Sequence, residues 1–315
     1  MMNNTADLGN GSHRVPAYIE WWYFHFVAED GTAVNMVIHE TDTFGRQHSP
    51  YISLSFWAPG QKPRYLRREL PDMQISRQAA WLQLGESFLQ EDAHCIRFHV
   101  PLPGQGHFSG EIIKLAPPLN VAGGILSKDA NTGQSSHWVV QVPHATFTAV
   151  LHLHEGEMYH LTGTAYQDHQ WGSLLLQDFV SDWVWGHFSN EYMAVVFFQI
   201  LTRHGRIIER FGLVLEQGCF VSTALPVSHL NALMQTPNPE RWQRTVEIRT
   251  LEVLASLSFA VGPEQLMRCR LGELYKQIEI SYLRWAAAAT YQAGQKQVPL
   301  YGITEYMRIR PLTGA

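Results

Sequence analysis

The residue types best suited to chemistry gather in one stretch, from Tyr166 to Phe188, with the sequence YQDHQWGSLLLQDFVSDWVWGHF. The ionisable residues Asp168, His169 and His187 are interleaved there with tryptophan and tyrosine rings. Buried strands usually carry few ionisable groups. Because Trp and Tyr combine a large apolar body with one polar group, they suit the wall of an apolar pocket that needs a few placed hydrogen bonds. This stretch is therefore the predicted functional site.

Tyr166 and Asp168 lie two residues apart, so on a strand their side chains point to the same face of the sheet. If that face lines a cavity, desolvation would raise the pKa of Asp168, and the carboxyl group could act as a general acid near neutral pH. Tyr166 would then hold the carboxyl group or donate a second hydrogen bond. A structural aspartate that caps a turn, beside a tyrosine that anchors the sheet, explains the same spacing.

His169 is expected to face away from Asp168, unless a β-bulge redirects it. We expect the chain to leave the strand over residues 169–172 and to turn at Gly172. Trp183, Trp185 and His187 share one strand face. A row of this kind is either a cavity wall or part of the core, where a histidine is usually a structural residue.

Near the N-terminus, Glu20 and Trp22 share one face of the strand that begins EWWYFH, and rings occupy both of its faces. Such a strand is expected to be buried on both sides, so its carboxylate needs a partner or a neutral form. His152, His154, Glu157 and His160 form the best metal-ligand pattern. A solvated hairpin tip explains them more simply, and we predict no metal.

The composition limits the function classes. The 315 residues are 45% hydrophobic and 16% charged, and the net charge of −5 with a pI near 6.3 argues against nucleic acid as the partner. Signatures of a P-loop, a dinucleotide fold and a serine nucleophile are absent, so we expect no cofactor. The sequence shows no apolar run long enough to span a membrane, no signal peptide and three widely spaced cysteines, which favours a cytoplasmic protein with reduced thiols.

The elements that must position these residues are short strands separated by Gly and Pro. Asp30-Gly31 and Glu155-Gly156-Glu157 predict hairpin turns. Residues 228–235 form the one expected helix, after Pro226. Residues 245–261 and 268–293, the latter including four consecutive alanines, are expected to be strands. The fold class is therefore all-β, built of barrels or sandwiches.

Four motifs add a family resemblance: EWWYF at 20–24, G-x-x-Y-x-D-H-x-W-G at 163–172, W-x-W-G-H at 183–187 and G-x-x-E-Y at 302–306. Together they resemble the superfamily of two-domain lipocalin-like proteins that includes carotenoid 1,2-hydratase (hydroxyneurosporene synthase), the AttH-like proteins and lipocalin-like Diels-Alderases. The resemblance implies two lipocalin-like β domains packed side by side, here residues 1–177 and 178–315.

The resemblance also implies three functions. The first is a cofactor-independent cyclase acting on a hydrophobic polyene, polyketide or isoprenoid intermediate in a pocket between the domains. The second is hydration of an isoprenoid C=C with Asp168 as general acid, and the third is a non-catalytic lipid or isoprenoid carrier. The expected catalytic residues are Asp168, Tyr166, His169 and His187. The expected substrate-binding residues are Trp22, Glu20, Trp138, Trp171, Trp183, Trp185 and Glu305.

Overall fold

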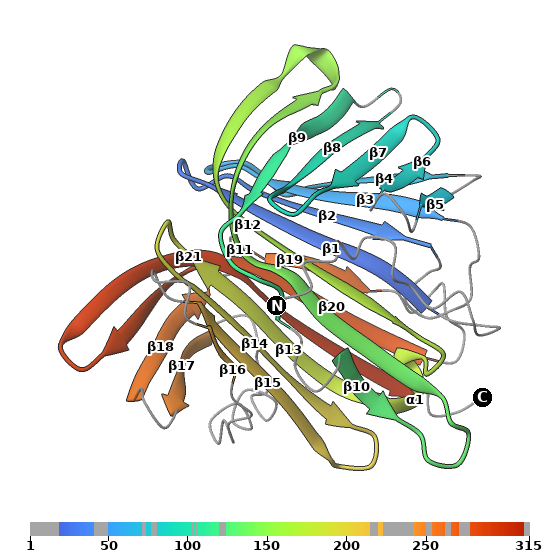
Figure 1. Ribbon diagram of the computed structural model, residues 1–315, viewed down its shortest axis with the longest axis vertical. Coiled ribbons are helices and arrows are strands. Elements are labelled where there is room, and N and C mark those ends of the chain that lie inside the picture. The colour runs from blue at the N-terminus through green and yellow to red at the C-terminus, as the bar shows by residue number, and fades with distance from the viewer. Residues whose placement is uncertain are drawn as a thin grey trace. The chain divides into compact units, whose positions relative to one another are not determined.

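The structure is a computed structural model, and it describes residues 19–40, 50–70, 74–76, 81–102, 104, 106–119, 124–214, 220–222, 242–249, 254–261, 266–270 and 278–311. The chain divides into two compact units between Leu175 and Leu176. The described strands form one 12-stranded and one 9-stranded sheet, all antiparallel in pairing, which confirms the all-β class (Figure 1). No helix in the described ranges is long and apolar enough to cross a membrane.

The sheet of unit 1 has the order β4-β3-β2-β1-β12-β11-β9-β8-β7-β6-β5, and β10 pairs with β11 outside this path. In chain order its strands are β1 (Ile19–Ala28), β2 (Ala33–His39), β3 (Tyr51–Trp57), β4 (Arg64–Glu69), β5 (Gln74–Ser76), β6 (Trp81–Leu84), β7 (Ser87–Glu91), β8 (Cys95–Leu102), β9 (Gly106–Lys114), β10 (Ile125–Lys128), β11 (Ser135–Leu153) and β12 (Met158–Gly172). β1 and β11 flank β12, so the predicted site stretch begins in the middle of the sheet.

Both predicted hairpin turns of unit 1 are present. The Asp30-Gly31 turn joins β1 to β2, with Gly31 at φ 84° and the Ala28 backbone N–H donating to the Thr32 carbonyl at 2.8 Å. That left-handed backbone favours glycine because it has no Cβ. The turn after Leu153 is a 3-10 helix, η2 (His154–Gly156), and it joins β11 to β12.

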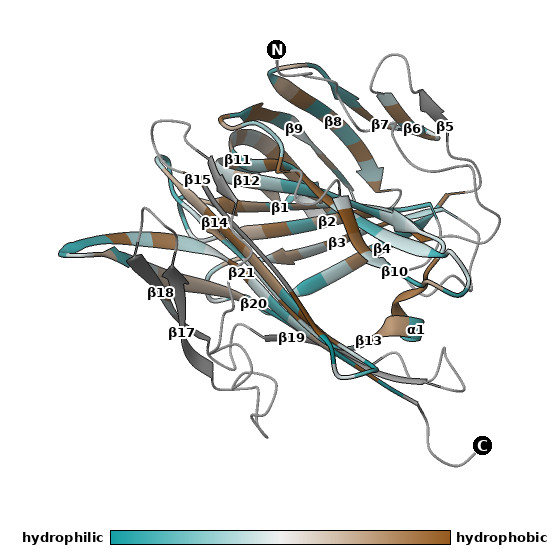
Figure 2. Ribbon diagram, turned by 60° about the horizontal axis from the view of Figure 1, so that its bottom comes forward, coloured by the Kyte–Doolittle hydropathy of each residue, from teal (hydrophilic) through white to brown (hydrophobic). Residues whose placement is uncertain are grey.

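One face of this sheet carries the core of unit 1. Trp22, Ile38 and Ile52 lie side by side on β1, β2 and β3, and the next two rows of this face are also apolar. The sheet curls, so Phe26 of β1 meets Phe98 of β8 and Phe108 of β9 at ring distances of 5.4 and 5.1 Å (Figure 1). Figure 2 shows the alternation that makes this face apolar as brown and teal bands along β8 and β9.

The sheet of unit 2 has the order β16-β15-β14-β13-β21-β20-β18-β17, and β19 pairs with β20. A four-residue helix, α1 (Leu176–Phe179), precedes it. The strands are β13 (Val180–Ser189), β14 (Ala194–Thr202), β15 (Ile207–Val214), β16 (Phe220–Ser222), β17 (Trp242–Arg249), β18 (Leu254–Val261), β19 (Leu266–Arg270), β20 (Ile278–Ala293) and β21 (Lys296–Pro311). β20 and β21 form the long orange-to-red hairpin of Figure 1.

Several sequence predictions need correction in detail. β12 runs on to Gly172, so residues 169–171 stay within the strand because they pair with both β1 and β11. Residues 245–261 and 268–293 contain parts of four strands, β17 to β20, rather than two long ones. The helix α1 was not predicted, because four residues are too few for a periodic pattern. The predicted helix at 228–235 lies outside the described residues.

Gly302 of β21 offers a test of how closely β21 packs against β13. A Cβ there would lie 1.8 Å from the carbonyl oxygen of His187, and backbone atoms cannot move aside as a flexible side chain can. We expect Gly302→Ala to lower the free energy of unfolding by about 3 kcal/mol, measured by urea denaturation.

The matched control is Gly294→Ala, in the turn of the same hairpin. An added Cβ meets nothing within 4 Å there, so only the positive φ of 59° opposes alanine, and the expected loss is about 1 kcal/mol. Equal losses for the two variants would contradict the close approach of β21 to β13.

Candidate functional site

The face of the unit 1 sheet opposite the core is polar and aromatic. Cross-strand register places its side chains in three rows over β3, β2, β1, β12 and β11. We call this set the polar face, and its rows are Tyr51, His39, Trp21, Gln170 and Trp138; Ser53, Val37, Tyr23, Asp168 and Val140; and Ser55, Asn35, His25 and Tyr166.

Asp168 and Tyr166 share the polar face, as their spacing predicted. The Tyr166 hydroxyl donates a 2.7 Å hydrogen bond to Asp168 Oδ2, and both residues are buried. Tyr23 and His25 of β1 pack their rings against Tyr166, with centroids 6.3 and 5.6 Å away. A carboxyl group thus lies among rings, with a phenol fixing the direction of one of its oxygens.

Side chains in two rows of the polar face are slightly more exposed to solvent than those of the core face. Except for Val140, which is fully covered, the residues of the first two rows keep 4–8% of their surface exposed. The third row keeps at most 2%, and the three core rows of β1, β2 and β3 keep at most 1%. Residual solvent therefore reaches Asp168 and Gln170, while Asn35, His25 and Tyr166 form a closed end.

The aromatic side chains of the first row pack against one another. His39 stacks on Tyr51 with centroids 4.2 Å apart, and the Arg67 guanidinium lies 3.8 Å above the Tyr51 ring. Trp21 is tilted against His39 at 6.3 Å. Such contacts fix the ring planes, which gives the face a defined shape.

His169, Glu20 and Trp22 lie on the opposite, core-side face of β12 and β1. His169 Nε2 is 2.8 Å from Glu20 Oε1, and both side chains are fully buried. The His169 ring stacks on Trp22 at 4.7 Å and lies 4.6 Å from Trp171. His169 is thus a partner of the buried Glu20 carboxylate, which the sequence did not reveal, and a ligand on the polar face would be separated from His169 by the sheet itself.

Trp171 and Trp138, both predicted to bind substrate, also lie on different faces. Trp171 stacks on His137 with centroids 5.1 Å apart, on the side of His169. Burial lowers the pKa of His137, so this imidazole is neutral at pH 7. Trp138 pairs with Gln170 and belongs to the polar face.

In unit 2 the predicted residues share one face. Trp183, Trp185 and His187 alternate along β13, and Glu305 of β21 lies directly opposite Trp185. Arg284 of β20 donates from Nε to Glu305 Oε1 at 2.6 Å, with both side chains 6% exposed. This face combines buried rings with a buried ion pair.

Tyr282 completes that group, since its hydroxyl oxygen accepts a hydrogen bond from Arg284 Nη2. Burial raises the pKa of Tyr282 well above its usual value, so it stays a neutral phenol. Neither Arg284 nor Tyr282 was predicted from sequence. The signal available was the alternation of Tyr282 and Arg284, two residues apart on a strand.

The other face of the same strands holds a second carboxylate group. Asp182 Oδ1 accepts hydrogen bonds from the Tyr306 hydroxyl at 2.7 Å and from Arg308 Nε at 2.8 Å, and Ser181 Oγ donates to Oδ2. Burial alone would raise the pKa of Asp182, but the hydrogen bonds from Arg308, Tyr306 and Ser181 outweigh it, and the pKa is lowered.

The histidine-rich hairpin does not gather ligands around one point. Glu157 forms a two-pronged ion pair with Arg64. His152 instead contacts the ring of His107, 5.3 Å away. Across the described residues, no group of three His, Cys, Asp or Glu side chains could hold a metal ion.

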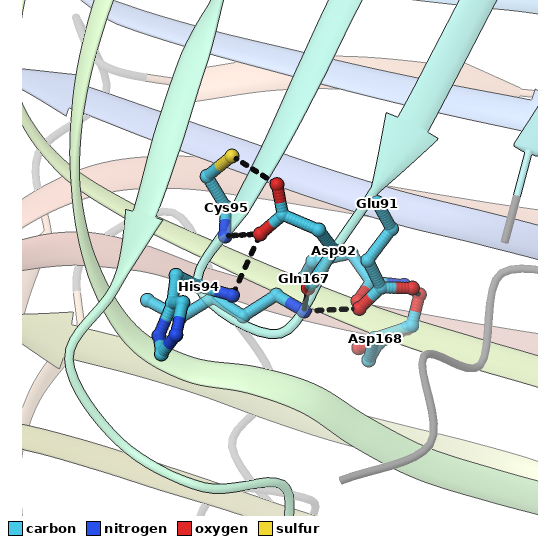
Figure 3. Close-up of polar contacts among 7 residues, drawn as sticks. Glu91, Asp92, His94, Cys95, Gln167 and Asp168 are labelled. Carbon is cyan, nitrogen blue, oxygen red and sulfur yellow. Dashed lines mark hydrogen bonds and ion pairs between the residues drawn. The ribbon is translucent and has the colours of Figure 1, made fainter.

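A further polar group surrounds Asp92, at the turn between β7 and β8. Its Oδ1 accepts the backbone N–H groups of His94 and Cys95, and Lys114 binds the neighbouring Glu91 (Figure 3). Burial, with the hydrogen bond to Asp92, raises the pKa of Cys95 to about 12, so its thiol is not a nucleophile at pH 7. Figure 3 also draws Gln167, whose Nε2 donates to the Asp168 carbonyl oxygen at 3.1 Å.

Sequence reasoning missed part of the polar face itself: His25, Asn35, Tyr23, His39 and Gln170. Tyr23 and His25 alternate with Trp22 and Phe24, so their common face was visible in the sequence. The pairing of β2 with β1 was needed to place Asn35 and His39 beside them.

The Glu20–His169 pair should stabilise the fold. We expect His169→Phe to lower the free energy of unfolding by about 3 kcal/mol, because the phenyl ring keeps the stack on Trp22 but leaves the Glu20 carboxylate without the imidazole. Urea denaturation of the single variant and of Glu20→Leu/His169→Phe measures this. The double variant should regain part of the loss, and a single variant as stable as wild type would contradict the pairing.

Asp182 should make stability depend on pH. Because its folded pKa is lowered, its contribution is fully present above the unfolded pKa, near 4, and is lost as the pH falls through the folded value. Asp182→Asn should cost about 2 kcal/mol at pH 7, and the difference from wild type should shrink below about pH 4. The exposed Asp178, changed to Asn, is the control, and a pH-independent difference for Asp182→Asn would contradict this assignment.

Comparison with known proteins gives structural matches only. No protein-family model matches the chain, and no curated protein matches its sequence. An AttH-like structure from Nitrosomonas europaea, described as a putative AttH, is 15% identical over 95% of this chain and 94% of its own, with a TM-score of 0.60. CghA with Sch210972 is 12% identical over 93% and 89%, with a TM-score of 0.67.

Kievitone hydratase from Nectria haematococca is 10% identical over 96% of this chain and 92% of its own, with a TM-score of 0.54. At these identities the likeness concerns the fold. The chain has the all-β fold of the AttH-like structure, CghA and kievitone hydratase, which confirms the lipocalin-like fold class that its motifs implied.

Proposed function

We propose that this protein is an enzyme that acts on a hydrophobic small molecule, and that its reaction is an intramolecular cyclisation on the polar face of unit 1. Fold neighbours support an enzyme in general: one bears the name of a hydratase and another was solved with the compound Sch210972. The substrate class follows from the motif resemblance and from the aromatic lining of the face.

The Tyr166–Asp168 pair is the observation that carries the proposal. A buried carboxyl group costs free energy unless it is hydrogen-bonded, and here the Tyr166 hydroxyl donates to a carboxyl group that residual solvent still reaches. Its cross-strand neighbours are the Tyr23 ring and the aliphatic side chain of Val140. A placed acid or base between apolar neighbours is typical of a catalytic site.

Such a face lowers the barrier to cyclisation mainly by orientation. A flexible substrate that is bound in its reactive conformation has already lost the conformational entropy that it would otherwise lose on reaching the transition state. The stacked rings of Trp21, His39 and Tyr51 supply fixed walls. Asp168, aimed by Tyr166, supplies electrostatic stabilisation where charge develops.

His169 and Glu20 take a supporting role in this proposal, because they lie on the core side of β12 and β1. They fix the two strands that carry Asp168 and Tyr23. In unit 2, His187 stays a predicted catalytic residue, and Trp183, Trp185 and Glu305 stay predicted substrate-binding residues.

Hydration of a C=C is the second candidate, favoured by the same pair. Asp168 protonated on Oδ1 would deliver that proton to carbon while Oδ2 still accepts the Tyr166 bond, and water would then capture the cation and return a proton to the Asp168 carboxylate. The fold shared with kievitone hydratase supports this candidate. A carrier without turnover is the third, and it has no need of a buried carboxyl group.

Product mass separates the three candidates. Purified protein is incubated with linear polyenes that carry a carbonyl group, and the products are analysed by liquid chromatography with mass spectrometry. We expect an isomer of unchanged mass and new retention time. A gain of one water would establish hydration instead, and recovery of unchanged substrate across the panel would contradict an enzyme of either kind.

Asp168→Asn separates cyclisation from hydration by rate. A cyclase that works mainly by orientation should lose about tenfold to a hundredfold in turnover, whereas a hydratase without its acid should lose nearly all of it. Tyr166→Phe should have a smaller effect in the same direction, since it removes only the bond that aims the carboxyl group. Gln167→Leu, on the core-side face of β12, is the control, and an equal loss in that variant would contradict a role for the polar face.

A further inference from the structure

Two amide side chains on the polar face carry carbonyl oxygens that accept no hydrogen bond within the described part of the chain. They are Asn35 Oδ1 and Gln170 Oε1. Their residues are 0% and 4% exposed, so bulk water does not solvate these oxygens freely. Native proteins seldom leave buried acceptors without donors, and such an atom calls for a specific partner.

The orientation of the Asn35 amide is determined by its neighbour. Its Nδ2 donates to the Phe24 carbonyl oxygen at 3.1 Å, and a carbonyl oxygen can only accept. Turning the amide over would set two acceptors against each other. Oδ1 must therefore point away from the Phe24 carbonyl, at the closed end of the face beside His25.

Gln170 stands at the other end, in the first row, between Trp21 and Trp138. Asp168 lies between the two ends, two residues from Gln170 along β12. A carboxylate is itself an acceptor, and the Tyr166 hydroxyl proton is already directed to it. The two amide oxygens and the carboxylate between them are thus all hydrogen-bond acceptors.

The register fixes how far apart the two amides are. Asn35 pairs with His25, and His25 pairs with Tyr166, which lies four residues before Gln170. Two strand spacings combined with four residues of rise give about 16 Å between their backbone positions.

We propose that Asn35 and Gln170 determine substrate specificity by binding a hydroxyl or N–H group at each end of an elongated, mostly apolar molecule. Its central carbons then lie beside Asp168. The proposal rests on the polar face being the site of the proposed function, but it concerns binding and needs no turnover. It excludes plain hydrocarbons as good ligands, because they leave both acceptors without donors.

The probes are a straight twelve-carbon diol, with one hydroxyl at each end, and its dimethyl ether. The extended diol spans about the distance between the amides, and the ether has the same skeleton without donors. Dissociation constants for the full chain are measured by isothermal titration calorimetry. We expect wild type to prefer the diol by about fivefold or more per hydroxyl.

Asn35→Leu and Gln170→Leu should each remove about half of this preference on a logarithmic scale, and the double variant should bind the two probes alike. Gln167→Leu is the matched control. Gln167 Oε1 also lacks a partner among the described residues, but it lies on the core side of β12, so this variant should keep the full preference. Far-UV circular dichroism and thermal unfolding check that each variant folds.

Equal affinity of wild type for diol and ether would overturn the proposal, since water would then satisfy both oxygens. A preference that survives in Asn35→Leu and Gln170→Leu would also overturn it, because the selectivity would come from shape. If Asn35→Leu does not fold, Gln170→Leu alone decides with the same criterion. Loss of the preference in these variants supports the proposal even if no turnover is ever observed, so its failure is distinct from failure of the proposed function.

Discussion

The alternation of side chains along β12 is the constraint on which the rest of the structure depends. This strand pairs with β1 on one side and β11 on the other, and both of its faces are buried in its second half. Each successive residue must therefore suit a different environment. Tyr166, Asp168 and Gln170 face the polar side, while Gln167 and His169 face the core. A slip of one residue would place the Asp168 carboxylate in the apolar core, which makes the register strongly determined.

Buried carboxylates in this protein recur beside tyrosines. Tyr166 binds Asp168, Tyr306 binds Asp182, and Tyr282 belongs to the Arg284–Glu305 group. A phenol suits this position because its ring fills apolar space while its hydroxyl satisfies one charged oxygen. An arginine also bonds the carboxylates of Asp182 and Glu305.

The sequence determined the architecture better than the site. Alternation and turn residues were sufficient for the all-β class and for the hairpins at Gly31 and Gly156. They also located the strand of β20, where four alanines favour helix but pair with β21 along their whole length. The face of His169 followed from counting, but its partner Glu20 lies 149 residues away and could not be deduced. No local sequence pattern identified Asn35 as a site residue, because its place in the polar face comes from the pairing of β2 with β1.

The edge strand β4 has a consequence for assembly. It ends the order of the unit 1 sheet, and its six residues include three arginines. An edge strand exposes backbone groups that could recruit a strand from another molecule. A second copy pairing parallel and in register would set each arginine against its own copy, while Arg68 is directed back to the Pro101 carbonyl oxygen on β8 at 2.5 Å. The edge is thereby protected from strand addition, and this matters in a chain with a low share of charged residues and a large share of aromatic ones.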